Sequence, residues 1–263
     1  MPDWFRNAEW NDEIAIAFED RLRRARHKAQ YLNIQGYTLL GTHPMAAATL
    51  LRRAGALEDP GQTARAYLYL GTALAMTGDL DGAIESLGQA IEAERRYPMC
   101  RTGAKLERAL LIAIAERHDL YEAALDDIEQ EAVMPFADQL LSALIAGTLI
   151  RGALGEDVQL MALAALEALS PEGKNESTLP THLSIDSLRR RLGALARTSE
   201  TQRIKLMSAL GLSQPGQNRL ESGRPTRVQA SRCRPASLIW QVELIQEECT
   251  SRCELQSSFK GGL

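Results

Sequence analysis

Breaks in a helical pattern recur along the first two thirds of this chain at a nearly constant spacing. Apolar residues repeat with a helical period over residues 7–170, and no strand-like alternation competes with that period. Turn-forming residues interrupt the pattern near positions 42, 78, 118 and 155, which lie 36, 40 and 37 residues apart. Such spacing is typical of repeated helical hairpins, because one hairpin cannot bury its apolar face without a neighbour. The sequence therefore predicts an all-α fold in which residues 1–170 form an array of about four helical hairpins.

The second interval of the array has the most specific pattern. Gly71 and Ala83 are small residues placed where the two helices of a hairpin would cross, so they allow a close approach. The other signature positions of this interval are Tyr67, Leu70, Leu74, Gly78, Leu87 and Ala90. This interval resembles the tetratricopeptide repeat (TPR), and we expect the whole segment to be a degenerate TPR-like α-solenoid. The third interval keeps the apolar face but has His118 in place of the turn glycine.

The resemblance also implies a binding face. Tetratricopeptide proteins bind extended or helical peptides along the concave face made by the first helix of each hairpin. In the second interval, the face positions would be Arg65, Leu68, Tyr69 and Thr72. Two of these, Leu68 and Tyr69, favour a protein or peptide ligand that is partly apolar. The alternative is that all four residues contact a neighbouring helix.

A polar segment separates the array from the rest of the chain. Residues 171–181 include two prolines and a glycine, which is typical of an inter-domain linker. Helical patterns resume beyond it, and we expect a small helical domain over residues 182–248. Residues 249–263 have no core pattern and are expected to form a disordered tail.

The C-terminal region contains a helix-turn-helix pattern. Gly211 lies between two short helical segments, where a glycine can adopt a positive φ at the end of a helix. Ser213 is suited to cap the second segment. The runs from Leu210 to Pro215 and from Arg219 to Arg224 resemble the Cro and lambda-repressor-like helix-turn-helix family, also called the xenobiotic-response-element (XRE) type.

That resemblance implies binding to double-stranded DNA. The start of the second helix would reach base edges in the major groove through Gln214, Pro215, Asn218 and Arg219. Phosphate contacts would come from Thr201, Gln202, Arg203, Ser213 and Arg224. One such unit contacts only a few base pairs, so a homodimer on a two-fold site is expected.

The charge distribution agrees with this division. The net charge of the chain is −4, but residues 1–179 carry 17 Lys and Arg against 27 Asp and Glu. Residues 180–234 carry 11 basic residues against 3 acidic ones, and so have a charge of +8. A basic block that coincides with a helix-turn-helix pattern favours phosphate binding, whereas an arginine-rich, solvated helix is the alternative.

Other function classes lack their motifs. The sequence has no dinucleotide-binding, P-loop, zinc-protease or hydrolase motif, so we expect no enzymatic activity and no cofactor. The four cysteines are too sparse for a disulfide framework and lack zinc-ligand spacing, so no metal is expected. No apolar run is long enough to span a bilayer, and the N-terminus does not resemble a secretion signal, which favours the cytoplasm.

Two functions fit these patterns. The first is a cytoplasmic protein-interaction scaffold with a DNA-binding helix-turn-helix, acting as a transcriptional regulator or an antitoxin-like protein. The alternative is a pure TPR-type interaction adaptor, or a toxin-neutralising, immunity-type partner, with no DNA binding.

Overall fold

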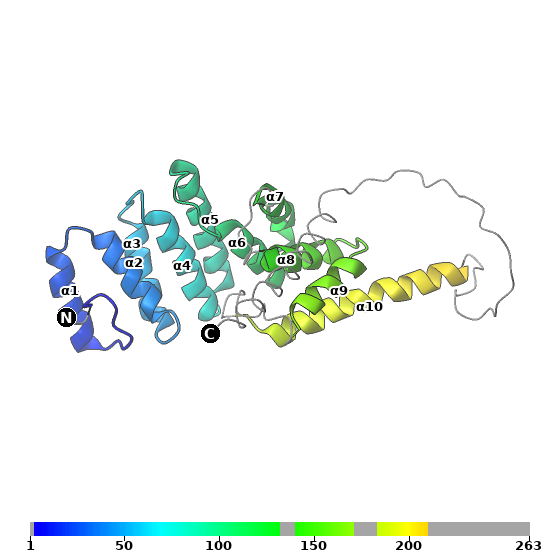
Figure 1. The fold of residues 1–263 in the computed structure, drawn as a ribbon, viewed down its shortest axis with the longest axis horizontal. Helices are drawn as coiled ribbons and strands as arrows, with labels where there is room; N and C mark the ends of the chain where they lie inside the picture. The colour runs from blue at the N-terminus through cyan, green and yellow to red at the C-terminus, as the bar shows by residue number, and fades with distance from the viewer. Residues whose placement is uncertain (1–2, 132–139, 171–182, 210–263) are drawn as a thin grey trace, which may run out of the picture. The chain divides into compact units, whose positions relative to one another are not determined.

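The computed structural model describes residues 3–131, 140–170 and 183–209, with the backbone alone over 198–209. Within these residues there are ten α-helices and one 3-10 helix and no strand, so the predicted all-α fold is confirmed. The helices, drawn in Figure 1, are α1 (Asp12–Arg24), α2 (Lys28–Leu39), α3 (Pro44–Gly55), α4 (Thr63–Met76), α5 (Leu80–Arg96), α6 (Ala104–Ile114), η1 (His118–Leu120), α7 (Tyr121–Glu131), α8 (Leu140–Ala153), α9 (Gln159–Ala168) and α10 (Ile185–Ala209).

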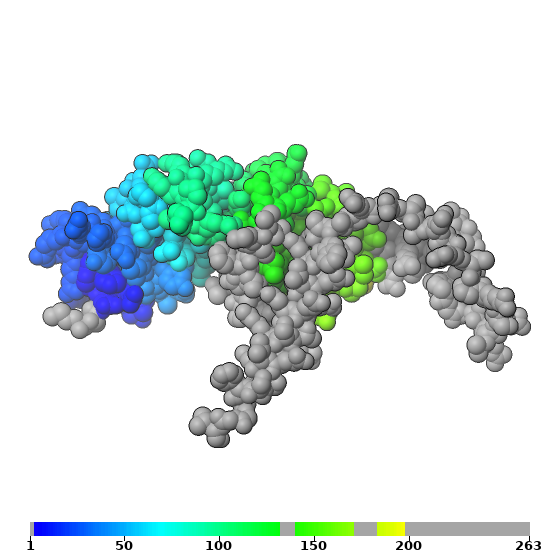
Figure 2. All heavy atoms as spheres, turned by 45° about the horizontal axis from the view of Figure 1, so that its top comes forward, coloured from blue at the N-terminus to red at the C-terminus, as the bar shows by residue number. Residues whose placement is uncertain are grey.

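The helices pair into successive hairpins whose turns lie at the four predicted breaks. The turns are at 40–43, 77–79, 115–120 and 154–158, between α2 and α3, α4 and α5, α6 and α7, and α8 and α9. Consecutive α-helices from α1 to α9 pack on one another, and α2 also contacts α4 while α6 contacts α8. First helices of neighbouring hairpins therefore meet. The space-filling view in Figure 2 shows their side chains packed in chain order, from blue through green.

Glycines allow the first two hairpins to close. A Cβ on Gly71 of α4 would lie 2.8 Å from Cγ of Leu87 and 3.2 Å from the Ala83 carbonyl oxygen of α5. In the hairpin before it, a Cβ on Gly36 of α2 would lie 2.6 Å from Cγ of Leu51 on α3. Two hairpins thus use the same device, a glycine on the first helix under a buried leucine of the second. The sequence pattern indicated this close crossing only in the second hairpin, at Gly71.

Three of the turns close in the same way. Backbone N–H groups of Asp79, Arg117 and Glu156 donate to the carbonyl five residues earlier, at 3.0, 3.1 and 3.0 Å. The residue before each donor has a positive φ: +86° at Gly78, 54° at Glu116 and +84° at Gly155. This is the Schellman ending of a helix.

The third turn corrects a sequence assignment. The left-handed position of this turn is Glu116, and His118, expected in place of the turn glycine, begins η1. The spacing of the breaks located the turn to within two residues, but the backbone hydrogen bond selects the residue that takes the positive φ.

A single core connects the hairpins. Each hairpin contributes completely buried side chains to it, among them Leu51, Leu87, Leu110, Ile145 and Leu169. Neighbouring hairpins also fit closely, since a Cβ on Gly55 at the end of α3 would lie 2.8 Å from Cζ of Tyr67 on α4. The burial of each hairpin against the next is what the repeat spacing predicts.

The start of α10 completes this core. Leu188 and Leu192 are buried in it, and a Cβ on Gly152 of α8 would lie 2.7 Å from Cδ2 of Leu195. The chain forms two compact units, Met1–Arg203 and Ile204–Leu263, so most of α10 belongs to the first unit. The predicted linker (171–181) lies wholly outside the described residues, as does most of the predicted C-terminal domain, and these boundaries stay predictions.

Candidate functional site

Helix α4 places the four predicted face residues together. Arg65, Tyr69 and Thr72 are spaced by four and three residues, so they form one stripe of the helix, with Leu68 beside them. Arg65 is exposed and the other three are partly buried. They are therefore accessible, although neighbouring helices contact two of them.

Helix α2 adds an aromatic partner to this stripe. The ring of Tyr37 lies against the ring of Tyr69, with centroids 4.8 Å apart and planes inclined by 41°. Tyr37 remains 57% exposed, which leaves a large part of this aromatic pair open to solvent. Burial raises the pKa of Tyr69 above its ordinary value, against an opposing effect from nearby Arg65. No sequence signal selected Tyr37, because only the packing of α2 on α4 brings it to Tyr69.

Helix α6 adds a carboxylate. Oγ1 of Thr72 donates to Oε1 of Glu107 at 3.0 Å, and Glu107 is itself partly buried. Burial raises the pKa of Glu107 to about 7, and the Thr72 hydrogen bond opposes this rise only in part. Among the described residues, no lysine or arginine pairs with this carboxylate. Sequence reasoning missed Glu107, since an isolated acidic residue on a helix is usually solvated.

We call the set Tyr37, Arg65, Leu68, Tyr69, Thr72 and Glu107 the Tyr–Glu face. Along α4 it presents a cation, then the tyrosine pair, then the carboxylate. Seven residues separate Arg65 from Thr72, which corresponds to about 10 Å along a helix axis. That length matches roughly three residues of extended peptide.

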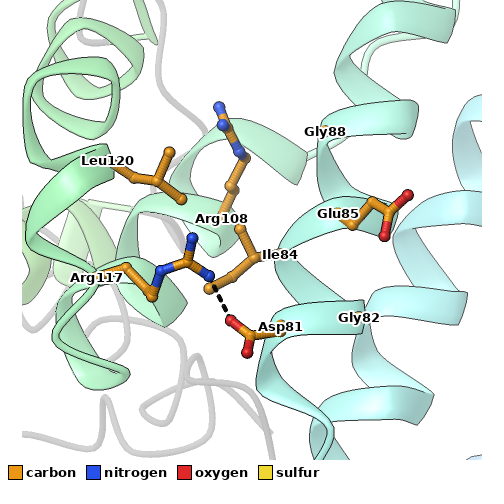
Figure 3. A pocket seen from close by; sticks show the side chains of 8 residues that line it. All are labelled: Asp81, Gly82, Ile84, Glu85, Gly88, Arg108, Arg117 and Leu120. Carbon is orange, nitrogen blue, oxygen red and sulfur yellow. Dashed lines mark hydrogen bonds and ion pairs between the residues drawn. The ribbon is translucent and has the colours of Figure 1, made fainter.

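A second feature is a surface hollow of about 500 Å³ between α5, α6 and η1. Figure 3 shows the side chain of Arg117 reaching across to Asp81 of α5. The lining residues are Asp81, Gly82, Ile84, Glu85, Gly88, Arg108, Arg117 and Leu120.

The charges in this hollow are already compensated. Arg117 pairs with Asp119 at 2.8 Å and also with Asp81, which is on α5. Arg108 donates from Nη1 to Asp127 of α7 at 2.9 Å, while its buried Nε has no hydrogen-bond partner. Both guanidinium groups therefore hold helices together, and the hollow has no excess positive charge to attract an anion. We regard it as a structural junction between hairpins.

The predicted DNA-binding residues are only partly covered. Thr201, Gln202 and Arg203 belong to the continuous helix α10. The remaining predicted contacts lie outside the described residues; these are Ser213, Gln214, Pro215, Asn218, Arg219 and Arg224.

Two arginines of the basic block bind the array. Arg191 donates to the carbonyl oxygens of Ala113 and Ile114 at the end of α6, at 3.0 and 3.2 Å, and pairs with Glu116 at 3.2 Å. Nε of Arg189 donates to the Leu169 carbonyl after α9 at 3.1 Å. Positive charge at helix C-termini is favourable, because unpaired carbonyl groups gather there. These two arginines therefore hold α10 against the helix ends of the array.

Fold and site together define an all-helical protein of stacked hairpins with an accessible aromatic and acidic face. No protein-family model matches the chain, and no curated protein or solved structure is significantly similar to it. None of the helices in the described part of the chain has the length and apolar character needed to cross a bilayer. Its function must therefore be inferred from its own residues.

Proposed function

We propose that this protein is a cytoplasmic, TPR-like adaptor that binds a peptide segment of a partner protein on the Tyr–Glu face. The observation that carries the proposal is the convergence of Tyr37, Tyr69 and Glu107 from three successive first helices. The equivalent glycines Gly36 and Gly71 support the likeness to a tetratricopeptide array.

The chemistry of the face suits a peptide. Tyrosines offer large contact areas together with a polar tip, and they are enriched where proteins bind one another. An open tyrosine pair between a cation and a carboxylate supplies both an apolar contact and polar groups that can fix a ligand's register.

Peptide selection with a matched variant tests this function. Linear peptides would be selected from a display library on the full-length chain, and their affinities measured by fluorescence anisotropy. We expect Tyr37→Ala to weaken selected peptides about tenfold, which corresponds to 1.4 kcal/mol. Met45→Ala is the control, because Met45 is 70% exposed and lies on α3, which contributes no residue to the Tyr–Glu face. Unchanged binding by Tyr37→Ala would reject the face as the site.

The second part of the proposal concerns DNA. The coincidence of the +8 block with the helix-turn-helix run favours a regulator that binds double-stranded DNA as a homodimer and responds to the ligand of the array. The competing function is the adaptor or immunity-type partner without DNA binding. Titration of the full chain with random-sequence duplex DNA at two salt concentrations separates them. Absence of binding at low salt leaves the adaptor alone.

A further inference from the structure

Within the described part of the chain, Glu107 lacks the positive partner that other acidic groups near it have. Asp127 pairs with Arg108 at 2.9 Å, and Glu131 pairs with Lys105 at 3.9 Å and with Arg101. Glu107 has only the hydroxyl of Thr72 among the described residues. A partly buried carboxylate without a cation is costly, because its desolvation is not offset by attraction.

The carboxylate of Glu107 is bonded to the helix that holds Tyr69. Thr72 approaches it from α4, and one helical turn along α4 from Thr72 lies Tyr69 with its partner Tyr37. Tyr69 and Thr72 are three residues apart, which corresponds to about 4.5 Å along the helix axis. This stretch of α4 therefore brings an aromatic pair and a carboxylate close together.

Lysine and arginine side chains combine an apolar part and a positive charge, which suit the tyrosine pair and the carboxylate. Each has an apolar stem that packs on hydrophobic surface and a positive head that remains at its end. Their cations are also attracted to tyrosine ring faces. The stem therefore matches the tyrosine pair in chemistry, and the cation matches the carboxylate.

Resting on the proposed function, we propose that the Tyr–Glu face selects partners by one lysine or arginine side chain, whose stem lies along Tyr37 and Tyr69 and whose charge pairs with Glu107. The ligand class is thus a peptide segment with a basic anchor residue. Its charge compensates a carboxylate that pairs with no cation among the described residues. An uncharged anchor of the same length can cover the tyrosine pair but leaves the carboxylate without a cation, so it binds more weakly.

Degenerate peptides with one fixed position test this selection. Fluorescent nonapeptide pools would carry lysine, arginine, norleucine or glutamate at the central position and equal mixtures elsewhere. Their affinities would be measured for the full-length protein, for Glu107→Gln and for Glu85→Gln. The glutamine at position 107 keeps the shape of the side chain and removes its charge. Glu85 is an exposed residue of α5, so its variant controls for the loss of one negative charge.

We expect the lysine and arginine pools to bind at least tenfold more tightly than the norleucine pool, and the glutamate pool to bind most weakly. Glu107→Gln should abolish this preference while retaining the affinity for norleucine, and Glu85→Gln should preserve it. Equal binding of all pools would overturn the basic anchor and leave the peptide-binding function standing. An equal loss of preference in both variants would also overturn it, since net charge would then be the cause. Failure of every pool to bind would overturn both.

Discussion

The hydroxyl of Thr72 on α4 lies 3.0 Å from a carboxylate oxygen of Glu107 on α6, and it is the one hydrogen-bond donor to that carboxylate among the described residues. Two hairpins that are adjacent in the chain are thereby joined at a group whose charged form is poorly stabilised. The same carboxylate limits the stability of the free protein, and it is the group with which we propose that a basic ligand side chain pairs.

Glu107→Gln should stabilise the free protein at high pH. The pKa of Glu107 is about 7 in the folded state, above its ordinary value of 4.5. Its contribution to stability is therefore fully present below about pH 4.5 and is lost as the pH rises through about 7. Glutamine cannot ionise, so at pH 8 the variant should exceed the wild type by about 1–3 kcal/mol in the free energy of unfolding, and at pH 5 by little.

Urea unfolding at pH 5 and pH 8 measures this difference. Glu85→Gln is the control, and its stability relative to the wild type should change little between the two pH values. A Glu107→Gln effect that is the same at both pH values would contradict the assignment, because it would not depend on ionisation.

Gly71→Ala should destabilise the array, whereas Gly88→Ala should not. The new methyl group at position 71 would lie 2.8 Å from Cγ of buried Leu87, and overpacking of this kind costs about 1–3 kcal/mol. At position 88 of α5 its nearest neighbour is Nε of Arg108 at 4.0 Å, so the higher helix propensity of alanine should prevail. Thermal melts compare the two variants, and an unchanged melting temperature for Gly71→Ala would contradict the close crossing of α4 and α5.

Arg191→Met should lower stability by about 1–3 kcal/mol, because the two carbonyl groups at the end of α6 lose a charged donor. Arg190→Met is the matched control one residue away. Arg190 is exposed and donates to the Asp186 carbonyl of its own helix, so its loss should cost less than about 0.5 kcal/mol. Chemical denaturation of both variants distinguishes them. Equal stabilities would mean that α10 does not cap the array through Arg191.

Arg219→Ala and Arg203→Ala should weaken DNA binding in different ways. If Arg219 contacts a base edge, its removal costs about 1–3 kcal/mol for a preferred sequence and relaxes the preference. If Arg203 contacts a phosphate, its removal weakens all sequences alike and lowers the salt dependence. Titrations of the full chain with selected and random duplexes, each at two salt concentrations, measure both effects. Identical behaviour of the two variants would reject the predicted division of roles.

Several features of the fold could be predicted because their signals are local in the chain. The four turns follow from the spacing of turn-forming residues, and the crossing at Gly71 follows from small residues at hairpin positions. The left-handed residue of the third turn was misassigned, because the φ angle at Glu116 depends on a backbone hydrogen bond formed only when α6 ends. The equivalence of Gly36 with Gly71 was missed for a similar reason, since it appears in the distance to Leu51 and not in a motif.

By itself, the sequence determined the helical class, the hairpin period and the α4 part of the face, since each depends on periodicity within one segment. The tertiary structure decided what surrounds that face. Tyr37 is 32 residues before Tyr69, and Glu107 is 35 residues after Thr72, so only the packing of three first helices brings them together. It also decided that Arg189 and Arg191 bind helix ends of the array. A charge in a sequence has no fixed partner, and its role is set by the groups that folding places within hydrogen-bond distance.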